Sequence, residues 1–561
     1  MEFAAVIHRP DSEMAYLKND VFQIRLKAKR DDLKKVALIY GDPYSLISEN
    51  LDPFYQHPQP MDKILQDQYY DYWELEVQLP TKRLAYAFVL VDNDDEAYYY
   101  NDQGFWPVDH DASLDNANSY FRLPYGHEID AIHVPSWVAG TVWYQIFPER
   151  FANGDPTNDP AGTKSWNPQD HPSRTAYYGG DLQGIIDHLD DLANLGVTGL
   201  YFNPLFLAPS NHKYDTIDYF QIDPHFGTNQ LFGELVQAAH QRGMRVMLDA
   251  VFNHLGINSP QWQDVIRYGQ QSTYADWFHI HEFPVTYQAT SNPEYSPAIS
   301  YETFANNPQM PKLNTTNPEV QAYLLSIATY WVKEYDIDAW RLDVANEIDH
   351  HFWRAFHQRM LALKPDFYIL GEIWHRAQAW LNGDQFSGVM NYPYTGLIID
   401  GIIKRQLSLN QLSAGLSRQL MLYRDQTNML MFNTLDSHDT ARLMTMATGN
   451  YRLVELAIAF LILQPGMPSL YYGTEIGIAG NNDPDCRKPM NWQPDAKGRH
   501  LAQQIKKLIA FRHRYGALLT AGKIKFVVVD PDRIQVVRFN DHQQVIGDFD
   551  LGSNSYQLQV K

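Results

Sequence analysis

The sequence predicts a multidomain protein: an N-terminal antiparallel β-sandwich, a central (β/α)8 TIM barrel with a lobe inserted after its third strand, and a short C-terminal β domain. Three observations predict it. The chain has 561 residues, more than one hydrophobic core usually supports. Its first part alternates apolar and polar residues with period two, and its middle alternates short apolar runs with amphipathic stretches. We expect the domains to span residues 1–134, 135–515 and 516–561.

The bulk composition excludes several classes of protein. Hydrophobic residues make up 45% of the chain, enough for sizeable cores and far from a disordered composition. The formal net charge of −21 argues against a nucleic acid or an anionic membrane as partner, and it fits a neutral substrate. The lone Cys486 cannot form an intrachain disulfide, which fits a reducing compartment. Residues 1–10 contain no signal-peptide core, and no run of 18 apolar residues occurs. We therefore expect a cytoplasmic protein.

The N-terminal domain is predicted from alternation along three segments. One face of each strand is apolar and the other is polar, as in an antiparallel sandwich with one solvated face. Pro124 and Pro135 enclose the expected linker. The apolar sets are Phe22, Ile24 and Leu26; Trp73, Leu75, Val77 and Leu79, which alternate with Tyr72, Glu74, Glu76 and Gln78; and Tyr86, Phe88 and Leu90.

The barrel is predicted from eight short apolar runs, with a helix-like stretch over 182–195 between the first two. Eight such units over roughly 370 residues are typical of a large (β/α)8 barrel with insertions. The expected strands are 142–147, 199–202, 245–250, 339–343, 369–371, 388–392, 429–435 and 469–472. Further strand-like segments at 524–530 and 533–539 indicate the C-terminal β domain.

The segment 255–316 is too long for a structureless loop. It is rich in aromatic residues, so we expect a small lobe beside the active face. Its aromatic residues are Trp262, Tyr274, Trp277, Phe278, Phe283, Tyr287, Tyr295, Tyr301 and Phe304.

Carboxylates end four of the predicted strands: Asp249, Asp343, Glu372 and Asp439. A single carboxylate after a strand is often an N-cap of the following helix. Four of them on four strands of one barrel are harder to explain in that way. Active sites of such barrels lie at the C-terminal ends of the strands, so these residues are the candidate site.

The segments around these carboxylates resemble the four conserved regions of the α-amylase superfamily, in the family's order. They read Asp249-Ala-Val-Phe-Asn-His254, Trp340-Arg-Leu-Asp343, Gly371-Glu-Ile-Trp-His375 and Asp436-Ser-His-Asp439. Two more segments, 142–150 and 466–475, extend the similarity, which covers about residues 135–500. The resemblance implies a glycoside hydrolase.

The resemblance also implies a role for each carboxylate. Asp343 matches the nucleophile. Glu372 matches the general acid, which later acts as the base. Asp439 matches the third carboxylate, which binds sugar hydroxyls. A retaining enzyme needs the first two about 5 Å apart to form and break a covalent glycosyl intermediate. Arg341, on the same strand face as Asp343, is expected to keep that carboxylate ionised, with Asp249 as the structural partner of the arginine.

The resemblance extends to residues that would contact the sugar. Tyr214 matches the aromatic residue that stacks on it, and His254 and His438 match donors to its hydroxyls. Trp374 follows the acid and is a candidate wall for the leaving-group side, while Asn253 is a structural support. Taken singly, each histidine is more often an ordinary packed or surface residue, and the alternative interpretation of Tyr214 is a packed tyrosine.

Three features narrow the subfamily. Met310-Pro-Lys-Leu-Asn314, Val344-Ala-Asn-Glu347 and the N-terminal β domain resemble the neopullulanase, cyclomaltodextrinase and maltogenic amylase group. In that group the N-terminal domain is starch-binding-like and packs against a partner's barrel, which implies a homodimer with a narrowed cleft. Glu347 matches a position linked to acceptor binding and glycosyl transfer; its other reading is a surface carboxylate.

A loop dense in oxygen ligands resembles the N-terminal calcium site of neopullulanase-type enzymes. Calcium takes six to eight oxygens from carboxylates, amides and carbonyls. The alternative is an Asx-rich turn held by its own backbone. No organic cofactor is expected. The implied ligands are Asn153, Asp155, Asn158, Asp159, Gly179 through its carbonyl, and Asp181.

The sequence thus predicts a retaining α-glucan hydrolase that cuts α-1,4 bonds of cyclodextrins and maltodextrins to maltose. Pullulan and starch are further candidate substrates, and α-1,6 cleavage and glycosyl transfer are candidate side activities. A second enzyme hypothesis is an oligo-1,6-glucosidase or a trehalose- or sucrose-directed isomerase, which usually lack the N-terminal domain. A non-enzyme hypothesis is an amylase-like sugar-binding protein or transporter subunit. Such relatives lose catalytic carboxylates, whereas this chain has all three.

Overall fold

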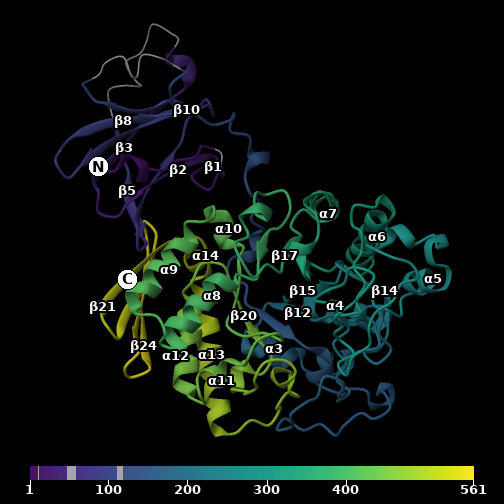
Figure 1. Ribbon diagram of the computed structural model, residues 1–561. Coiled ribbons are helices and arrows are strands. Elements are labelled where there is room, and N and C mark those ends of the chain that lie inside the picture. Colours follow the sequence, from purple (N-terminus) through teal and green to yellow (C-terminus); the bar gives the residue numbers. More distant parts are fainter. Residues whose placement is uncertain (11, 47–57, 110–117) are drawn as a thin grey trace.

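The chain folds into a sandwich, a barrel and a C-terminal sheet, in that order along the sequence (Figure 1). This computed structural model describes residues 1–10, 12–46, 58–109 and 118–561. The fold class predicted from the sequence is confirmed.

The N-terminal domain consists of two antiparallel sheets. Its core comes from the inward residues of facing strands, among them Ile24, Leu26 and Phe88, all fully buried. One sheet has the order β1 (Ala15–Lys18), β2 (Val21–Lys29), β6 (Tyr70–Val77) and β5 (Asp62–Gln66). The other has the order β4 (Gln59–Pro60), β3 (Leu33–Gly41), β7 (Ala85–Asp92), β8 (Ala97–Asn101) and β9 (Gly104–Pro107), with β10 (Phe121–Arg122) beside β7.

One part of the predicted pattern is wrong. The alternation predicts that Tyr72 and Glu74 face water, yet both are buried. Tyr72 packs with Leu65 in the same hydrophobic cluster as the barrel. Glu74 accepts a hydrogen bond from Arg25 Nε at 2.9 Å. The outer face of β6 is covered because the sandwich docks on the barrel, which local alternation cannot reveal.

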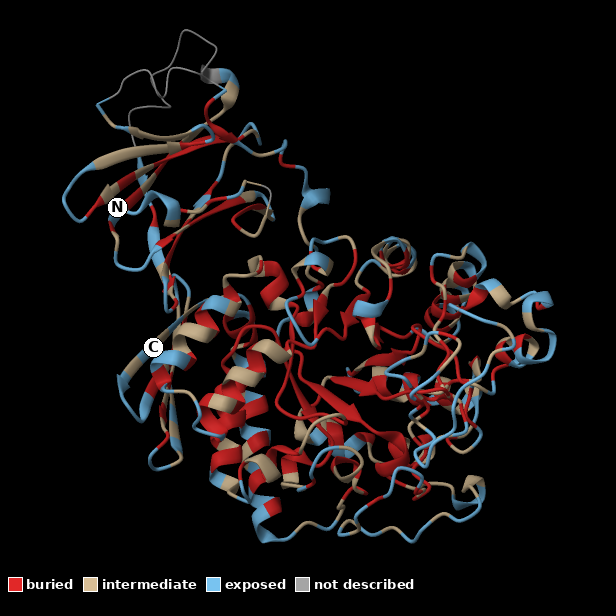
Figure 2. Cartoon of the chain, viewed as in Figure 1, coloured by how far each residue is buried: buried red, intermediate tan, exposed pale blue. Residues whose placement is uncertain are grey.

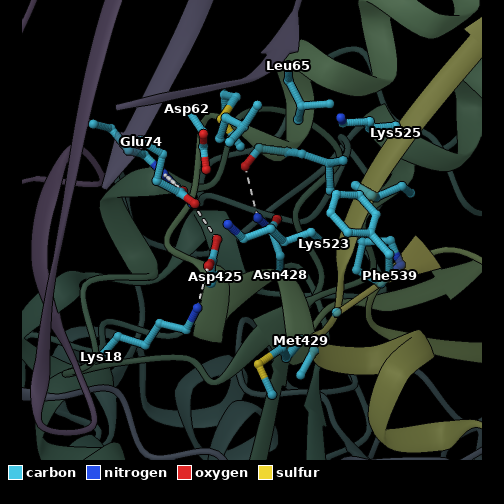
Figure 3. A pocket seen from close by; sticks show the side chains of 18 of the residues that line it. Lys18, Asp62, Leu65, Glu74, Asp425, Asn428, Met429, Lys523, Lys525 and Phe539 are labelled. Atoms are coloured by element: carbon cyan, nitrogen blue, oxygen red, sulfur yellow. Dashed lines mark hydrogen bonds and ion pairs between the residues drawn. The ribbon is translucent and has the colours of Figure 1, made fainter. Parts of the chain in front are cut away.

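Charged side chains, of which Arg25 and Glu74 are buried, form the junction between the domains, beside a cavity of about 260 Å³ (Figure 3). Arg25 bonds to Glu74 and also to Asp425 of α10 (Asp425–Met429). Lys18 reaches the same Asp425 at 2.8 Å, and Arg25 also donates to the carbonyl of Tyr423 at 2.9 Å. Because each charge has an opposite partner, the junction fixes the sandwich on this side of the barrel.

The barrel has eight parallel strands. Their spatial order is β18, β17, β16, β15, β12, β11, β20, β19. Their bounds are β11 (Trp143–Ile146), β12 (Gly199–Phe202), β15 (Arg245–Ala250), β16 (Ala339–Leu342), β17 (Tyr368–Gly371), β18 (Gly388–Val389), β19 (Phe432–Thr434) and β20 (Met467–Tyr471). Some predicted strand limits are wrong, because Tyr392 begins α8 and Met429 ends α10.

The seam between β18 and β19 is closed by a side-chain hydrogen bond and by close packing of the two backbones. Asn391 Nδ2 donates to Asn433 Oδ1 at 2.7 Å across it. A Cβ at Gly388 would lie 2.1 Å from the carbonyl oxygen of Leu430, so only glycine allows the two backbones to come this close.

Helices cover the barrel, most of them with one buried face, whereas α12 is buried almost all round. The barrel strands are coloured red in Figure 2 because their residues are buried. The stretch predicted over 182–195 is two helices, separated at His188. The helices are α2 (Leu182–Asp187), α3 (Leu189–Leu195), α4 (Asn229–Gln241), α6 (Pro318–Tyr335), α7 (His350–Leu363), α8 (Tyr392–Ile398), α9 (Leu409–Leu420), α11 (Leu443–Met446), α12 (Tyr451–Ile462) and α13 (Ala496–Arg514).

The segment after β15 forms the expected lobe around α5 (Pro260–Tyr268). Isolated bridges such as Ile280–Tyr301 fold the rest of it back on itself. A two-stranded ribbon, β13 (Phe206–Leu207) and β14 (Asp218–Ile222), follows β12.

The C-terminal domain follows α14 (Gly516–Ala521) and is an antiparallel meander of four strands, of which the sequence predicts only the first two. They are β21 (Lys523–Asp530), β22 (Arg533–Phe539), β23 (Gln544–Asp550) and β24 (Ser555–Val560). None of the helices in the described ranges has the length and apolar content to cross a membrane.

Candidate active site

Neighbouring strands bring three carboxylates to one end of the barrel. Asp249 lies in β15, and Asp343 and Glu372 directly follow β16 and β17. The amide of Asp343 donates to Ala250 O, and that of Glu372 to Leu342 O, both at 3.0 Å. This parallel register places Asp343 and Glu372 at the same height in adjacent strands, while Asp249 is level with Arg341. All three lie at the C-terminal ends of their strands, as the strand-end argument predicts.

Arg341 joins these three carboxylates. Its Nη1 donates to Asp249 at 2.8 and 3.0 Å and to Asp343 Oδ1 at 2.7 Å. Its Nη2 lies 2.8 Å from Glu372 Oε1. The guanidinium is fully buried, so these charge-assisted contacts are not weakened by water.

The cluster has more negative than positive groups. Burial raises the pKa of Asp343 well above its ordinary value, an effect that Arg341 opposes and Glu372 increases. Burial also raises the pKa of Asp249, again against Arg341. One guanidinium cannot neutralise three carboxylates, so the cluster favours keeping a proton.

Backbone strain helps to position Glu372. Val344 has φ +47°, a left-handed conformation that is costly for a β-branched residue. In this conformation its N–H donates to Glu372 Oε2 at 2.9 Å. Trp374 Nε1 donates to Glu372 Oε1 at 3.2 Å. The strained residue therefore directs a donor at the candidate acid.

Asp439 lies in the loop after β19 and is less enclosed, with its side chain 31% exposed. Burial raises its pKa to about 7; Glu372 adds to this rise, while Arg487 and Arg341 oppose it. His438 Nε2 lies 3.2 Å from Asp439 Oδ2, and Arg487 Nη2 lies 3.5 Å from Oδ1.

Tyr214 and His438 form one hydrogen-bonded layer. The Tyr214 hydroxyl lies 2.7 Å from His438 Nε2 and donates to Asp249 Oδ2 at 3.0 Å. Gln145 Nε2 lies 2.8 Å from the other ring nitrogen of His438. Burial lowers the pKa of His438 well below its ordinary value, so the ring is neutral at pH 7. Both of its nitrogens have protein partners, which a sugar hydroxyl would have to replace.

His254 contacts the backbone carbonyl of Tyr214. Its Nε2 is 3.0 Å from Tyr214 O, and Asn253 Nδ2 is 3.2 Å from its Nδ1. Burial lowers the pKa of His254 to about 3. Lys312 bonds to Asn253 Oδ1 and, at 2.9 Å, to Glu347 O. Asn253 thus ties the lobe to the barrel, which fits the supporting role that the resemblance implies.

These residues surround a cavity of about 740 Å³. Residues at the strand ends, in the lobe and in the loops after β11 and β20 line it. The predicted residues that line it are Tyr214, Asn253, His254, Asp343, Glu347, Glu372, Trp374, His438 and Asp439; Arg341 and Asp249 lie behind them.

Trp374 and Glu347 are the exposed residues among the predicted ones that line the cavity. Trp374 is 48% exposed and stacks on Tyr392, with ring centroids 3.6 Å apart and planes 4° apart. An exposed indole held rigid by stacking is suited to contact the apolar face of a sugar. The Glu347 carboxylate is half-exposed, 3.7 Å from Lys312 Nζ.

The structure brings the predicted calcium ligands together. Asp181 is fully buried and accepts hydrogen bonds from the amides of Gly154 and Asp155, at 3.0 and 2.8 Å. Asn153 Oδ1 and Asn158 Oδ1 are buried without a hydrogen-bond partner.

Two further contacts decide how well this loop suits a cation. Asn153 Nδ2 donates to Asp159 Oδ1 at 2.9 Å. Burial, with Asp181 and Asp155 nearby, raises the pKa of Asp159. Asp155, by contrast, accepts from the Thr157 amide and hydroxyl, as the turn interpretation expects. The described residues hold no metal cluster of three or more His, Cys, Asp or Glu side chains. The unpartnered amide oxygens of Asn153 and Asn158 are ligand atoms of the kind that calcium takes.

Sequence reasoning missed Arg487 and Asp483, which line the cavity beside Asp439. Arg487 Nη1 lies 2.9 Å from Asp483 Oδ1 and its Nε donates to His438 O at 2.9 Å. The charged segment 483–488 could have indicated them, because it follows the last barrel strand at the end of the barrel where active sites lie. Tyr201, whose hydroxyl donates to Asp249 at 2.8 Å, was also missed, because a strand tyrosine is more often core.

Two family models match most of the chain. The alpha amylase catalytic domain matches residues 145–517, and the alpha amylase N-terminal Ig-like domain matches residues 1–127.

Individual proteins are similar over nearly the whole length. The intracellular maltogenic amylase of Bacillus subtilis (strain 168) is 47% identical over 99% of this chain and 92% of its own. The cyclomaltodextrinase of Geobacillus thermopakistaniensis (strain MAS1) is 48% identical over 95% of this chain and 88% of its own. A solved cyclomaltodextrinase structure superposes with a TM-score of 0.90 at 42% identity, covering 98% of this chain and 91% of that one. The chain therefore belongs to the α-amylase family and is an α-glucan hydrolase of its cyclomaltodextrinase, maltogenic amylase and neopullulanase group.

Proposed function

We propose that the protein is a retaining hydrolase in which Asp343 attacks the anomeric carbon and Glu372 first protonates the leaving oxygen and then activates water. Asp439 binds hydroxyls of the distorted sugar. The observation that carries this proposal is that Asp343 and Glu372 form ion pairs with the two terminal nitrogens of one buried guanidinium, at 2.7 and 2.8 Å.

This shared guanidinium supports the stereochemical outcome. Retaining enzymes hold their two carboxyl groups about 5–5.5 Å apart, whereas inverting enzymes leave about 6.5–9.5 Å for a water molecule. Two carboxylates on one Arg341 favour the shorter separation. The same arginine stabilises Asp343 as an anion before attack and as a leaving group when the covalent intermediate is hydrolysed.

The substrates that we propose are cyclodextrins and maltodextrins, cut at α-1,4 bonds with maltose as the main product. The names of the relatives, maltogenic amylase and cyclomaltodextrinase, support this choice. Pullulan and starch are secondary candidates. Trp374 and Glu347, both exposed in the lining of the cavity, would bind an acceptor sugar, which would allow glycosyl transfer and some α-1,6 cleavage.

Initial rates on β-cyclodextrin, soluble starch and pullulan, with product identification, test this proposal. We expect β-cyclodextrin to be cut faster than starch, with maltose as the product. A wide preference for starch would contradict the subfamily specificity. Dominant α-1,6 cleavage or isomerisation of trehalose or sucrose would favour the second enzyme hypothesis, and binding without turnover would favour the non-enzyme one.

We propose calcium as a structural ion held by the oxygens of Asn153, Asn158, Asp159 and Asp181, with the Gly179 carbonyl and a lesser part for Asp155. The two unpartnered amide oxygens support it. The ion would neutralise the buried carboxylates of this loop, which precedes α2, and no catalytic step depends on it. Metal analysis that finds no calcium after extensive soaking would remove this proposal.

We also propose a homodimer formed through the N-terminal domain, and a cytoplasmic location. The resemblance of that domain to partner-binding modules supports the dimer, and the word intracellular in the name of the Bacillus relative supports the location. Light scattering of the full chain is expected to give twice the mass of one chain. Fractionation of the native host is expected to find the enzyme inside the cell, whereas enzyme in the medium would contradict the location.

A further inference from the structure

An ion pair across the cavity is not explained by the catalytic residues. Arg174 lies in the long connection between β11 and α2, and Glu294 lies in the lobe, 120 residues further along the chain. The Arg174 guanidinium and the Glu294 carboxylate form a hydrogen-bonded ion pair. Both side chains line the cavity that contains Asp343 and Glu372.

Arg174 belongs to a wall made of two loops. His171 Nδ1 lies 2.6 Å from Asp485 Oδ1, and Arg174 Nη2 lies 3.8 Å from Asp483 Oδ2. These contacts fasten the Arg174 loop to the segment that follows β20. Asp483 in turn contacts Arg487, which contacts Asp439. A row of alternating charges thus leads from Asp439 outward to Arg174.

Glu294 belongs to the opposite wall. Within the ranges that the structure covers, no other hydrogen bond or ion pair joins the lobe, residues 255–316, to residues 166–178 or 480–492. The Arg174–Glu294 pair is therefore the polar link that closes the gap between the lobe and this wall.

The strand order places this link away from the leaving group. Glu372 and Trp374 follow β17, and the acid protonates the leaving oxygen, so they mark the leaving-group side. The Arg174 loop follows β11, which stands four positions from β17 in the ring of eight strands and is therefore directly across it. A glucan chain that extends away from the leaving group runs toward Arg174 and Glu294.

We propose that the Arg174–Glu294 pair closes the cleft at this end and limits how many glucose units the enzyme accepts on the side that keeps the new covalent bond. The pair is thereby a determinant of product length, and it favours release of maltose over longer oligosaccharides. This inference rests on the proposed hydrolysis of α-1,4-glucans. It gives a role to Arg174 and Glu294, which the proposed catalytic steps do not use.

The expected effect is a redistribution of products. The Arg174 side chain is 58% exposed and that of Glu294 is 31% exposed, so water and salt weaken their attraction. A pair of this kind opens at modest cost, so its removal is expected to change product ratios by about threefold.

The test uses maltoheptaose labelled at its reducing end and two variants, Glu294→Gln and Arg174→Met. If two units are accepted beyond the cut, the wild-type enzyme yields labelled maltopentaose. Each variant is expected to raise the ratio of labelled maltotetraose to labelled maltopentaose about threefold. Maltotriose, which is too short to reach the pair, is expected to be cut by all three proteins.

Glu302→Gln is the matched control, because Glu302 is a lobe carboxylate paired with His281 and does not line the cavity. Its product ratio is expected to equal that of the wild type. Unchanged ratios in both cavity variants would overturn the inference, and so would loss of maltotriose cleavage, since a barrier is not needed to break the bond. A wild-type enzyme that cuts no α-1,4-linked oligosaccharide would instead overturn the proposed function.

Discussion

The guanidinium of Arg341 holds the carboxylate of Asp343 at 2.7 Å from two positions earlier on the same side of a strand. Because alternate residues of a strand point the same way, this contact is built into the local sequence. The same guanidinium reaches Asp249 and Glu372, so one buried cation organises the charges of the site.

Arg341→Lys is expected to lower kcat/KM on β-cyclodextrin by about 10²- to 10³-fold, the effect of removing a preorganised donor. Lysine keeps the charge, but it cannot present a planar fork to three carboxylates. Arg245→Lys is the control, because Arg245 begins β15 at the other end of the barrel and pairs with Asp338 at 2.9 Å. A loss of less than tenfold in Arg341→Lys would show that the shared guanidinium is dispensable.

Arg487→Met is expected to move the acidic limb of the pH profile of kcat/KM to higher pH. The pKa of Asp439 is raised to about 7, and Arg487 lowers it. Removing this cation therefore raises the pKa further, by about one unit for a nearby charge. Since the ionised form binds the sugar, activity is lost at a higher pH as the solution is acidified.

This profile reports groups of the free enzyme. Arg354→Met, which breaks an exposed pair with Asp384, serves as control and leaves the limb in place. An acidic limb that stays or moves to lower pH in Arg487→Met would contradict the link between Arg487 and Asp439.

Addition of calcium is expected to raise the Tm of the wild-type protein, and a chelator is expected to lower it, because binding stabilises only the folded state. Asn153→Ala removes an unpartnered amide oxygen and is expected to abolish this response. Asn167→Ala, which alters a nearby exposed turn around Gln169, should keep it. A Tm that does not depend on calcium in the wild type would favour the turn interpretation.

Arg25→Met is expected to destabilise the junction of the sandwich and the barrel by about 3 kcal/mol, because it leaves Glu74 buried without its cation. Calorimetry should show a lower Tm. The double variant Arg25→Met/Glu74→Leu should recover part of this loss, since it removes the uncompensated charge. Arg9→Met, which breaks an exposed pair with Glu13, should cost less than about 1 kcal/mol. An equal effect of Arg25→Met and Arg9→Met would contradict a structural role for the junction.

The sequence predicted the site well where chemistry and local pattern coincide. Asp343 and Glu372 follow short apolar strands, and the barrel rule places such positions at one end. The parallel register then brings them together, so their proximity needed no long-range information.

Local pattern failed where the environment comes from distant chain segments. The alternation predicts that Tyr72 and Glu74 lie on a solvent-exposed face, but docking on the barrel buries them. Asp439 and Arg487 are 48 positions apart, and the parallel pairing of β19 with β20 places their loops side by side. Tyr392 continues an apolar run but begins a helix, where it supports Trp374. Tertiary packing decides each of these cases.

The most direct test of the account uses Glu372→Gln with α-maltosyl fluoride, a donor whose leaving group needs no acid. Fluoride departs as the Asp343 carboxylate oxygen bonds to the anomeric carbon, and the missing base slows hydrolysis of this ester. Peptide mass spectrometry is expected to find one maltosyl group on Asp343, and none in Asp343→Asn/Glu372→Gln. A maltosyl group on Asp439 instead, or maltose of inverted configuration with no adduct, would contradict the assignment of Asp343 as nucleophile.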